Sequence, residues 1–341
     1  MRIRLLLAWL TVLWVSLAQS MTASAAGPAI LFEAESGNII YAEDANRLWY
    51  PASLTKMMTA YIAFEEIKAG RLSLTDQLTA SVHSSRQAPS KIGLPVGRQM
   101  SVDLGLQTLI VKSANDVAVM IAEKISGNVH DFADKMNKTA RKLGMNRTRY
   151  YNPNGLPDGR QITTARDQGL LAQAIIKNFP EHAPLFKQIY VHVGKRKLRS
   201  HNDMLRKYVG SDGMKTGFVC ASGFNVVTSA TRNKRRLVAV IMGATNSAKR
   251  RVRAMKLLNY GFGIYKWKNL YEPVNIKNSA DGINDLRGPK NMRYTVASGS
   301  CNRRAAIKRR QARRKLNKKA AARKKAVKSG KAAKKKNTKK K

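Results

Sequence analysis

The spacing of apolar residues predicts a helix that starts close to residue 53. Apolar side chains recur at helical intervals in YPASLTKMMTAYIAFEEIKAG, which runs from Tyr50 to Gly70. Thr163 or Thr164 can cap a later helix, because threonine oxygens accept free backbone N–H groups. The further helices predicted ahead of residue 180 are Val102–Lys112, Asp116–Ile125, His130–Leu143 and Asp167–Asn178.

Strand patterns lie before and after these helices. Ile30–Ala34 and Asn38–Ala42 are short β-like runs around the turn-forming ESG. Later, MKTGFVC is β-like, and FNVVTSAT and RLVAVIMGA flank the polar turn RNKR, which predicts a β-hairpin. RLVAVIMGA is almost wholly apolar, as in a central strand covered on both faces. A last helix is predicted over Ala248–Tyr260, ending at Gly261. Strands separated by helices predict an α+β fold, an antiparallel sheet layered with helices plus a helical subdomain.

The N-terminus has the pattern of a secretory signal peptide over residues 1–26. A cationic start precedes an apolar run from Leu5 to about Ala18, and a small-residue cleavage site follows, after Ala25 or Ala26. The run is shorter than the roughly 20 residues of a spanning helix, which favours cleavage over a permanent anchor. We therefore expect an exported protein of the periplasm or cell wall.

The other end of the sequence is strongly basic. Residues 303–341 carry 21 Lys or Arg and no acid, in a chain of net charge +44. Blocks of like charge repel each other, so this tail is expected to be disordered. In an exported protein its expected partners are anionic lipid head groups, lipopolysaccharide or acidic wall polymer, with nucleic acid only a minor alternative. Residues 27–265 form one predicted domain, and residues 266–302 are a short C-terminal extension.

The sequence has two cysteines, Cys220 and Cys301. In an oxidising compartment they can pair. Two free thiols are the alternative, and the sequence alone does not decide between the two states. The histidines show no spacing typical of metal ligands, so neither a metal nor another cofactor is expected.

Three short motifs carry candidate chemistry. Ser53 and Lys56 form S-x-x-K and lie on one face of the first predicted helix. KSAND places Ser113 and Asn115 in a loop between two helices, and GSDGMKTGF places Lys215 at the start of a strand. Taken singly, each motif has a structural explanation as a helix cap, a surface lysine or a polar strand end.

Together, and in this order, S-x-x-K, S-x-N and K-T-G resemble the motifs of the penicillin-binding serine acyl-transferases. The stretches YPASLTKMMTAY, LIVKSANDVAV, YYNPNGLPD and GSDGMKTGF are similar to the low-molecular-mass D-alanyl-D-alanine carboxypeptidases of the S11 type. The resemblance covers residues 27–265. It implies a DD-peptidase/β-lactamase-like fold and a hydrolase that removes the terminal D-alanine from peptidoglycan stem pentapeptides. It also implies β-lactams as covalent inhibitors.

The resemblance assigns the bond-breaking roles. Ser53 would be the acylated nucleophile, because a serine hydroxyl becomes reactive when a nearby base takes its proton. Lys56 would be that base, with its pKa lowered by burial and by nearby cations. Ser113 would relay a proton to the leaving amine. The backbone N–H groups of Ser53 and Phe218 would form the oxyanion hole.

Substrate binding follows from the same resemblance. Asn115 would hold the substrate's amide backbone, while Lys215 and Thr216 would bind its terminal carboxylate. Gly217 would let the strand approach the substrate closely. Some family members have an arginine directly after the strand that corresponds to Leu237–Gly243. Here Ala244, Thr245 and Asn246 follow instead, so the contribution of such an arginine is open.

Two other departures from the family concern the C-terminal side. Residues 266–302 are too short for the second, β-rich domain of many members. The tail lacks the apolar face of a membrane-anchoring helix. The alternative functions are a D,D-endopeptidase acting on wall cross-links, a β-lactamase and a catalytically inert polyanion-binding wall protein. The sequence lacks the E-x-x-L-N motif of class A β-lactamases, and the intact set of motif residues argues against an inert protein.

Overall fold

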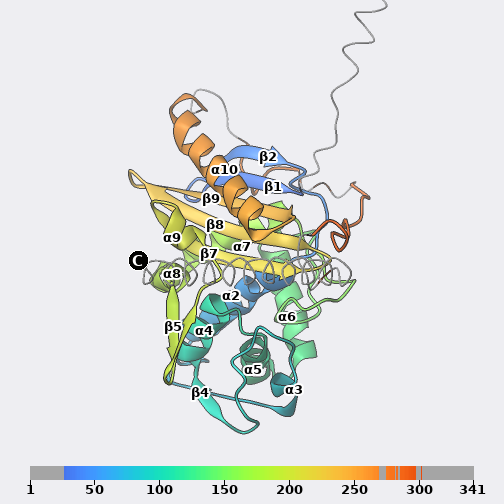
Figure 1. Cartoon of the computed structure of the whole chain (residues 1–341), viewed down its shortest axis with the longest axis vertical. Helices are drawn as coiled ribbons and strands as arrows, with labels where there is room; N and C mark the ends of the chain where they lie inside the picture. Colours follow the sequence, from blue (N-terminus) through green and yellow to red (C-terminus); the bar gives the residue numbers. More distant parts are fainter. Residues whose placement is uncertain (1–26, 269–273, 281, 283–284, 297–300, 302–341) are drawn as a thin grey trace, which may run out of the picture.

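The computed structural model describes residues 27–268, 274–280, 282, 285–296 and 301 (Figure 1). The predicted signal peptide and basic tail lie outside these residues. A five-stranded antiparallel sheet with the order β2-β1-β9-β8-β7 forms the centre of the fold. Its strands are β1 (Ala29–Glu33), β2 (Ile39–Glu43), β7 (Ser211–Val219), β8 (Gly223–Arg232) and β9 (Arg235–Ala244).

The central position predicted for the apolar strand is confirmed. β9 lies between β1 and β8, and its residues from Leu237 to Gly243 are buried. The predicted hairpin joins β8 to β9 through Asn233 and Lys234, which both have the positive φ that primed turns require. β7 is an edge strand of the sheet, so one of its sides pairs with no other strand among the described residues.

Alternate residues of the central strands face two separate cores, as the pleat of a sheet dictates. Leu31, Leu237 and Ile241 pack with Leu258 of α10 (Ser247–Lys268), which covers one face (Figure 1). The other face joins the main core with α2 (Thr55–Lys68) and α7 (Ala165–Asn178). The S-x-x-K motif therefore lies at the start of a buried helix, with Ser53 just ahead of α2 and Lys56 in its first turn.

α10 is longer than the helix that the pattern predicted, and the predicted end at Gly261 was wrong. The helix continues to Lys268. A β-carbon at Gly261 would lie 2.7 Å from Leu31 Cδ2 and 2.8 Å from Leu237 Cδ1. This glycine therefore allows close packing of helix on sheet, and it does not end the helix.

The helical subdomain lies on the β7 side of the sheet in Figure 1 and packs around α2. Its main helices are α4 (Val102–Val111), α5 (Asn115–Ser126) and α6 (Val129–Lys142). The smaller elements are α3 (Val82–Ser85), β3 (Gln77–Thr79) and β4 (Gln99–Ser101). Thr164 is the cap of α7, because its hydroxyl accepts a hydrogen bond from the Asp167 N–H at 3.0 Å. The α+β fold predicted from the sequence is confirmed.

The segment between α7 and β7 has structure that the sequence pattern did not predict. η2 (Pro180–His182) and α8 (Ala183–Lys187) lead into the hairpin of β5 (Tyr190–Val193) and β6 (Arg196–Arg199), and α9 (Met204–Lys207) follows. These elements have three to five residues each and few apolar positions, which is too little for a periodic signal.

The C-terminal extension packs onto the domain. Ile276, Met292 and Val296 are buried in the main core, and the Met292 N–H donates to the Ala221 carbonyl at 2.9 Å. A Cys220–Cys301 disulfide, with a Cα–Cα distance of 5.4 Å, answers the question that the sequence left open. It closes a loop of 81 residues. In the chain-entropy model such a loop contributes about 4–5 kcal/mol of stability. Among the described residues, no helix combines the length and apolar character needed to cross a membrane.

Candidate active site

Ser53 lies in a strained turn ahead of α2. It is the middle residue of the 3-10 helix η1 (Ala52–Leu54), and Ala52 before it has φ +50°. Gly155 packs against this turn so closely that a β-carbon there would lie 1.9 Å from the Ala52 carbonyl oxygen. The Ser53 side chain does not cap α2, whose N-cap residue is Leu54. The helix-cap explanation of S-x-x-K is therefore wrong.

Lys56 is buried one turn further on and points back at Ser53. Its Nζ donates to Ser53 Oγ at 3.1 Å, to Asn115 Oδ1 at 2.6 Å and to the Asn154 carbonyl at 2.5 Å. No carboxylate among the described residues accepts a hydrogen bond from it. Burial lowers the pKa of Lys56 well below its usual value, the positive charge of Lys215 lowers it further, and Asp116 opposes both.

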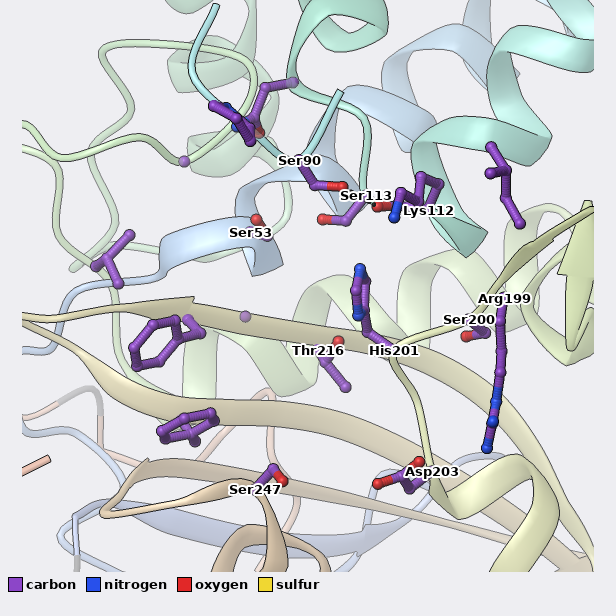
Figure 2. Close-up of a pocket in the computed structure, with 18 of the residues that line it drawn as sticks. Ser53, Ser90, Lys112, Ser113, Arg199, Ser200, His201, Asp203, Thr216 and Ser247 are labelled. Atoms are coloured by element: carbon purple, nitrogen blue, oxygen red, sulfur yellow. Dashed lines mark hydrogen bonds between the residues drawn. The ribbon is translucent and has the colours of Figure 1, made fainter. Parts of the chain in front are cut away.

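The S-x-N loop brings Ser113 and Asn115 to the same place from the subdomain. Ser113 has φ +61°, and its buried Oγ has no hydrogen-bond partner among the described residues. A non-glycine residue in this conformation is strained, and such residues cluster at functional sites. Asn115 is fixed by a hydrogen bond from its Nδ2 to the Ala88 carbonyl at 2.8 Å. Figure 2 shows Ser113 and Ser53 close together on one side of a cleft.

The K-T-G motif forms the opposite wall, on the edge strand β7. Lys215 is buried, and its Nζ donates to the Thr216 carbonyl at 3.1 Å. Burial, aided by the charge of Arg250, lowers the pKa of Lys215 to about 7. A β-carbon at Gly217 would lie 3.0 Å from the Pro51 carbonyl oxygen and 3.1 Å from the Ser53 nitrogen, so a side chain there would require β7 or η1 to shift slightly. The Phe218 ring stacks on Phe224 at 4.2 Å.

All eight residues predicted from the sequence meet at one cleft of about 860 Å³. Lys56 and Lys215 lie buried beneath it. The other six line it, namely Ser53, Ser113, Asn115, Thr216, Gly217 and Phe218. Figure 2 labels Ser53, Ser113 and Thr216 among them. Leu156, Val219 and Phe224 make one end of the cleft apolar. We call the other end, where Lys112, His201 and Arg250 lie, the basic end.

Arg250 is a site residue that the sequence reasoning missed. It comes from the first turn of α10, four residues after Asn246. Its buried guanidinium donates to the His201 carbonyl at 3.4 Å and to the Asn225 carbonyl at 3.5 Å, and burial lowers its pKa to about 10. An arginine therefore does line the cleft, although none directly follows the last strand. The sequence of α10 contains seven Lys or Arg residues, and nothing in that pattern marks the one that faces the cleft.

His201 was also missed, and it is neutral at ordinary pH. Partial burial, followed by the charges of Lys215, Lys112 and Arg250, lowers its pKa to about 4. Asp203, the acid at this end of the cleft, is already paired with Arg206 at 2.6 Å and Arg251 at 3.3 Å. The basic end therefore keeps a surplus of positive charge that suits an anionic group. The described residues contain no group of three or more His, Cys, Asp or Glu that could hold a metal.

The arrangement provides a hydroxyl beside a buried amine, with further cations a short distance away. A lysine that is neutral at working pH can take the hydroxyl proton. The cations at the basic end can bind a carboxylate. Serine acyl transfer to or from a peptide with a free C-terminal carboxylate would use groups of these kinds.

Known proteins are similar to this chain in both sequence and fold. The model of the family described as D-alanyl-D-alanine carboxypeptidase matches residues 16–246. The D-alanyl-D-alanine carboxypeptidase DacA of Haemophilus influenzae is 37% identical over 242 residues, which are 70% of this chain and 62% of that protein. DacC of Escherichia coli is 33% identical over 70% of this chain and 61% of its own length. This chain spans less than two thirds of the length of these curated relatives.

Solved structures of penicillin-binding proteins have a similar fold. Penicillin binding protein 5 from Haemophilus influenzae has a TM-score of 0.68 and 36% identity, over 70% of this chain and 71% of that one. Penicillin-binding protein D2 from Listeria monocytogenes, solved in the ampicillin-bound form, has a TM-score of 0.65 and 30% identity. The match covers 71% of this chain and 100% of that one. On this sequence match, with the fold and motif geometry in support, the chain belongs to the S11 family of D-alanyl-D-alanine carboxypeptidases.

Proposed function

We propose that this chain is a serine D-alanyl-D-alanine carboxypeptidase that removes the terminal D-alanine from peptidoglycan stem pentapeptides. The observation that carries the proposal is the contact between Lys56 Nζ and Ser53 Oγ at 3.1 Å, made by a buried lysine with a lowered pKa. The family membership and the basic end of the cleft support the choice of substrate. The ampicillin-bound relative supports acylation by β-lactams.

In the proposed mechanism, Lys56 takes the proton of Ser53 Oγ while this oxygen attacks the carbonyl carbon of the last peptide bond. The backbone N–H groups of Ser53 and Phe218 stabilise the oxyanion, a term worth roughly 3–4 kcal/mol per donor in other enzymes. The proton passes through Ser113 to the leaving nitrogen, the C–N bond breaks, and D-alanine departs. Water then attacks the ester, again with Lys56 as the base, and Ser53 regains its proton.

The basic end of the cleft would bind the terminal carboxylate of the substrate. Lys215 and Thr216 lie on β7, and Arg250 reaches the same end from α10. A carboxylate there would receive charge-assisted hydrogen bonds. Asn115, fixed by Ala88, would hold the amide backbone of the substrate opposite β7.

A substrate amidated at its C-terminus is expected to react much more slowly than the free acid. One lost charge-assisted hydrogen bond is worth about 1.5–3 kcal/mol, or roughly ten- to a hundredfold in kcat/KM. Arg250→Gln provides the matched control. It should slow the acid substrate but leave the amide nearly unchanged, because the contact is already missing there. Equal kcat/KM values for the acid and the amide would show that the enzyme does not recognise the terminal carboxylate.

The pH profile of kcat/KM for the acid substrate is expected to be bell-shaped. The base Lys56 must be neutral, so the rate rises with pH through its lowered pKa. Lys215 must be protonated to bind the carboxylate, and its pKa is about 7, so the rate falls above that pH. Because the charge of Lys215 affects the pKa of Lys56, the rising and falling limbs of the profile report the pair of lysines together. A value of kcat/KM that still rises at pH 9 would contradict this role of Lys215.

We further propose that the chain is exported and that its basic tail binds an anionic surface. The Cys220–Cys301 disulfide supports export, because such bonds persist in oxidising compartments. The 21 basic residues of 303–341 support the anionic partner. Co-sedimentation with anionic wall fragments is expected to weaken steeply with salt, as multivalent charge binding does. Retention that is unchanged in 1 M salt would show that charge does not hold the chain there.

A further inference from the structure

Two adjoining hollows lie beside α6, which runs along one side of the helical subdomain in Figure 1. The larger has a volume of about 690 Å³ and the smaller about 320 Å³, and they share Lys142 and Asn178. We call the pair the α6 groove. It reaches Glu66 near the end of α2, whereas Ser53 lies just ahead of the start of this helix. At about 1.5 Å per residue, roughly 20 Å of helix separate the groove from Ser53.

Cations dominate the lining of the α6 groove. Lys138 and Lys142 line it from α6, and Lys277 lines it from the C-terminal extension. All three residues are exposed, and none forms an ion pair with another described residue. Lys142 suits the negative end of the α6 dipole, but Lys138 lies between it and Lys135 on one helix face, where like charges repel. The groove therefore presents positive charge that no ion pair in the described part of the chain uses.

The two acids that line the α6 groove do not cancel this charge. Glu66 accepts hydrogen bonds from Arg71 Nε at 2.6 Å and from Lys135 Nζ at 2.6 Å, and these bonds lower its pKa to about 2. Burial raises the pKa of Glu65, while the charge of Lys142 opposes that rise. Glu66 is thus already paired, and a single further carboxyl group stands against the three exposed lysines.

Arg166 holds the extension against the α6 groove. Its buried guanidinium donates to the Lys277 carbonyl at 3.0 Å, to Ser279 Oγ at 3.0 Å and to the Gly144 carbonyl at 3.2 Å. The neighbouring Ile276 is buried in the main core. The backbone of this wall is therefore fixed before any ligand binds, which reduces the entropy that binding costs.

The α6 groove fits an anionic chain better than it fits a lipid surface. Among the described residues, no exposed large hydrophobic side chain lines the groove, so it offers nothing to insert into a bilayer. On the proposed function, each hydrolysis leaves a new terminal carboxylate on a stem peptide. A glycan strand that carries trimmed stem peptides is therefore a polyanion that this enzyme itself produces.

We propose that the α6 groove is a second binding site, separate from the cleft, for the carboxylates of peptidoglycan strands. The groove and the cleft have no lining residue in common among the described residues, so a strand in the groove leaves the cleft open to another stem peptide. Only the identity of the polymer rests on the proposed function, because the preference for an anion follows from the groove itself.

The first test measures how fast each lysine of the full chain is acetylated, with and without soluble, uncross-linked strands whose stem peptides are already trimmed. Peptide mass mapping gives the rate at each lysine. At a strand concentration ten times the Kd found from the protection, acetylation of the three groove lysines should slow by about tenfold. The matched controls are Lys187, Lys256 and Lys290, which are exposed, line neither hollow and should keep their rates. Strands with amidated carboxylates should protect none of the six.

The second test compares two triple variants of the full chain that lose the same charge. Replacement of the three groove lysines by Gln is expected to raise the Kd for the strands roughly three- to a hundredfold at low salt, as the loss of three exposed charge contacts predicts. The slope of log K against log salt should become shallower by about two. Replacement of the three control lysines by Gln should change both quantities little. Neither triple variant should alter kcat/KM for the free pentapeptide.

Equal protection of the groove and control lysines, or equal Kd values for the two triple variants, would show that the α6 groove is not a binding site. Protection by amidated strands would show that carboxylates are not what it binds. Protection by vesicles of anionic phospholipid but not by strands would assign the groove to a membrane surface, and the proposal would be wrong. A wild-type protein that fails to cleave the free pentapeptide would instead contradict the proposed function.

Discussion

Replacement of Ser53 by alanine is expected to abolish labelling by a fluorescent penicillin and release of D-alanine. The expected loss is on the order of 10⁶-fold, as in another serine hydrolase that lost its nucleophile. The domain should remain folded, because the Ser53 side chain faces a cleft and caps no helix. Peptide mass mapping of the wild-type protein should place one penicilloyl group on Ser53.

Ser247→Ala is the matched control for this experiment. Ser247 also lines the cleft, at the start of α10, but Figure 2 places it on the far wall from Ser53. The control variant should label as the wild type does. Persistent labelling of Ser53→Ala would assign the nucleophile to another residue and would contradict the proposed mechanism.

Replacement of Lys56 by methionine is expected to lower the rate of acylation by roughly 10²–10⁴-fold, the usual contribution of a general base. Methionine has a similar volume and carries no buried charge. It does leave Asn115 Oδ1 and the Asn154 carbonyl without their donor, which costs about 1–3 kcal/mol per group. The acylation rate therefore has to be measured below the thermal midpoint of the variant, by stopped-flow with a chromogenic β-lactam.

Lys68→Met is the control at the other end of the same helix. Lys68 is exposed and far from the cleft, so acylation should proceed at the wild-type rate. The rising limb of the pH profile gives a second readout, since it should disappear in Lys56→Met alone. Acylation at the wild-type rate in Lys56→Met would show that another group takes the serine proton.

Where a segment has a strong periodic pattern, the sequence predicted the structure closely. β8, β9 and α2 were recognisable because their apolar residues must meet a core, and the pattern of burial is local. The eight site residues could be named because three short motifs occur in a fixed order. Their meeting at one cleft is a property of the fold, which the motifs only imply through the resemblance.

What the sequence could not reveal depends on contacts between distant segments. Gly261 looks like a helix end, and only the packing of Leu31 and Leu237 against it shows why the helix continues. Arg250 is one cation among many in the sequence, and only the placement of α10 in the fold shows that it lines the cleft. The pairing of Cys220 with Cys301 depends on the path of the extension across the domain, which no local pattern encodes.

The two lysines buried beneath the cleft have a consequence for the evolution and engineering of this chain. Lys56 and Lys215 are both almost wholly inaccessible, and each lowers the stability of the folded state, because burial disfavours a charged amine. Apolar substitutes of similar size would remove this cost of burying a charge and the reaction with it, and at Lys56 the acceptors left without a donor would offset part of the gain. A selection for heat resistance alone would therefore tend to enrich inactive sequences at these positions, a conflict between stability and activity that is common at active sites. Screens for a more thermostable enzyme should keep both lysines unchanged and look for stabilising substitutions elsewhere in the domain.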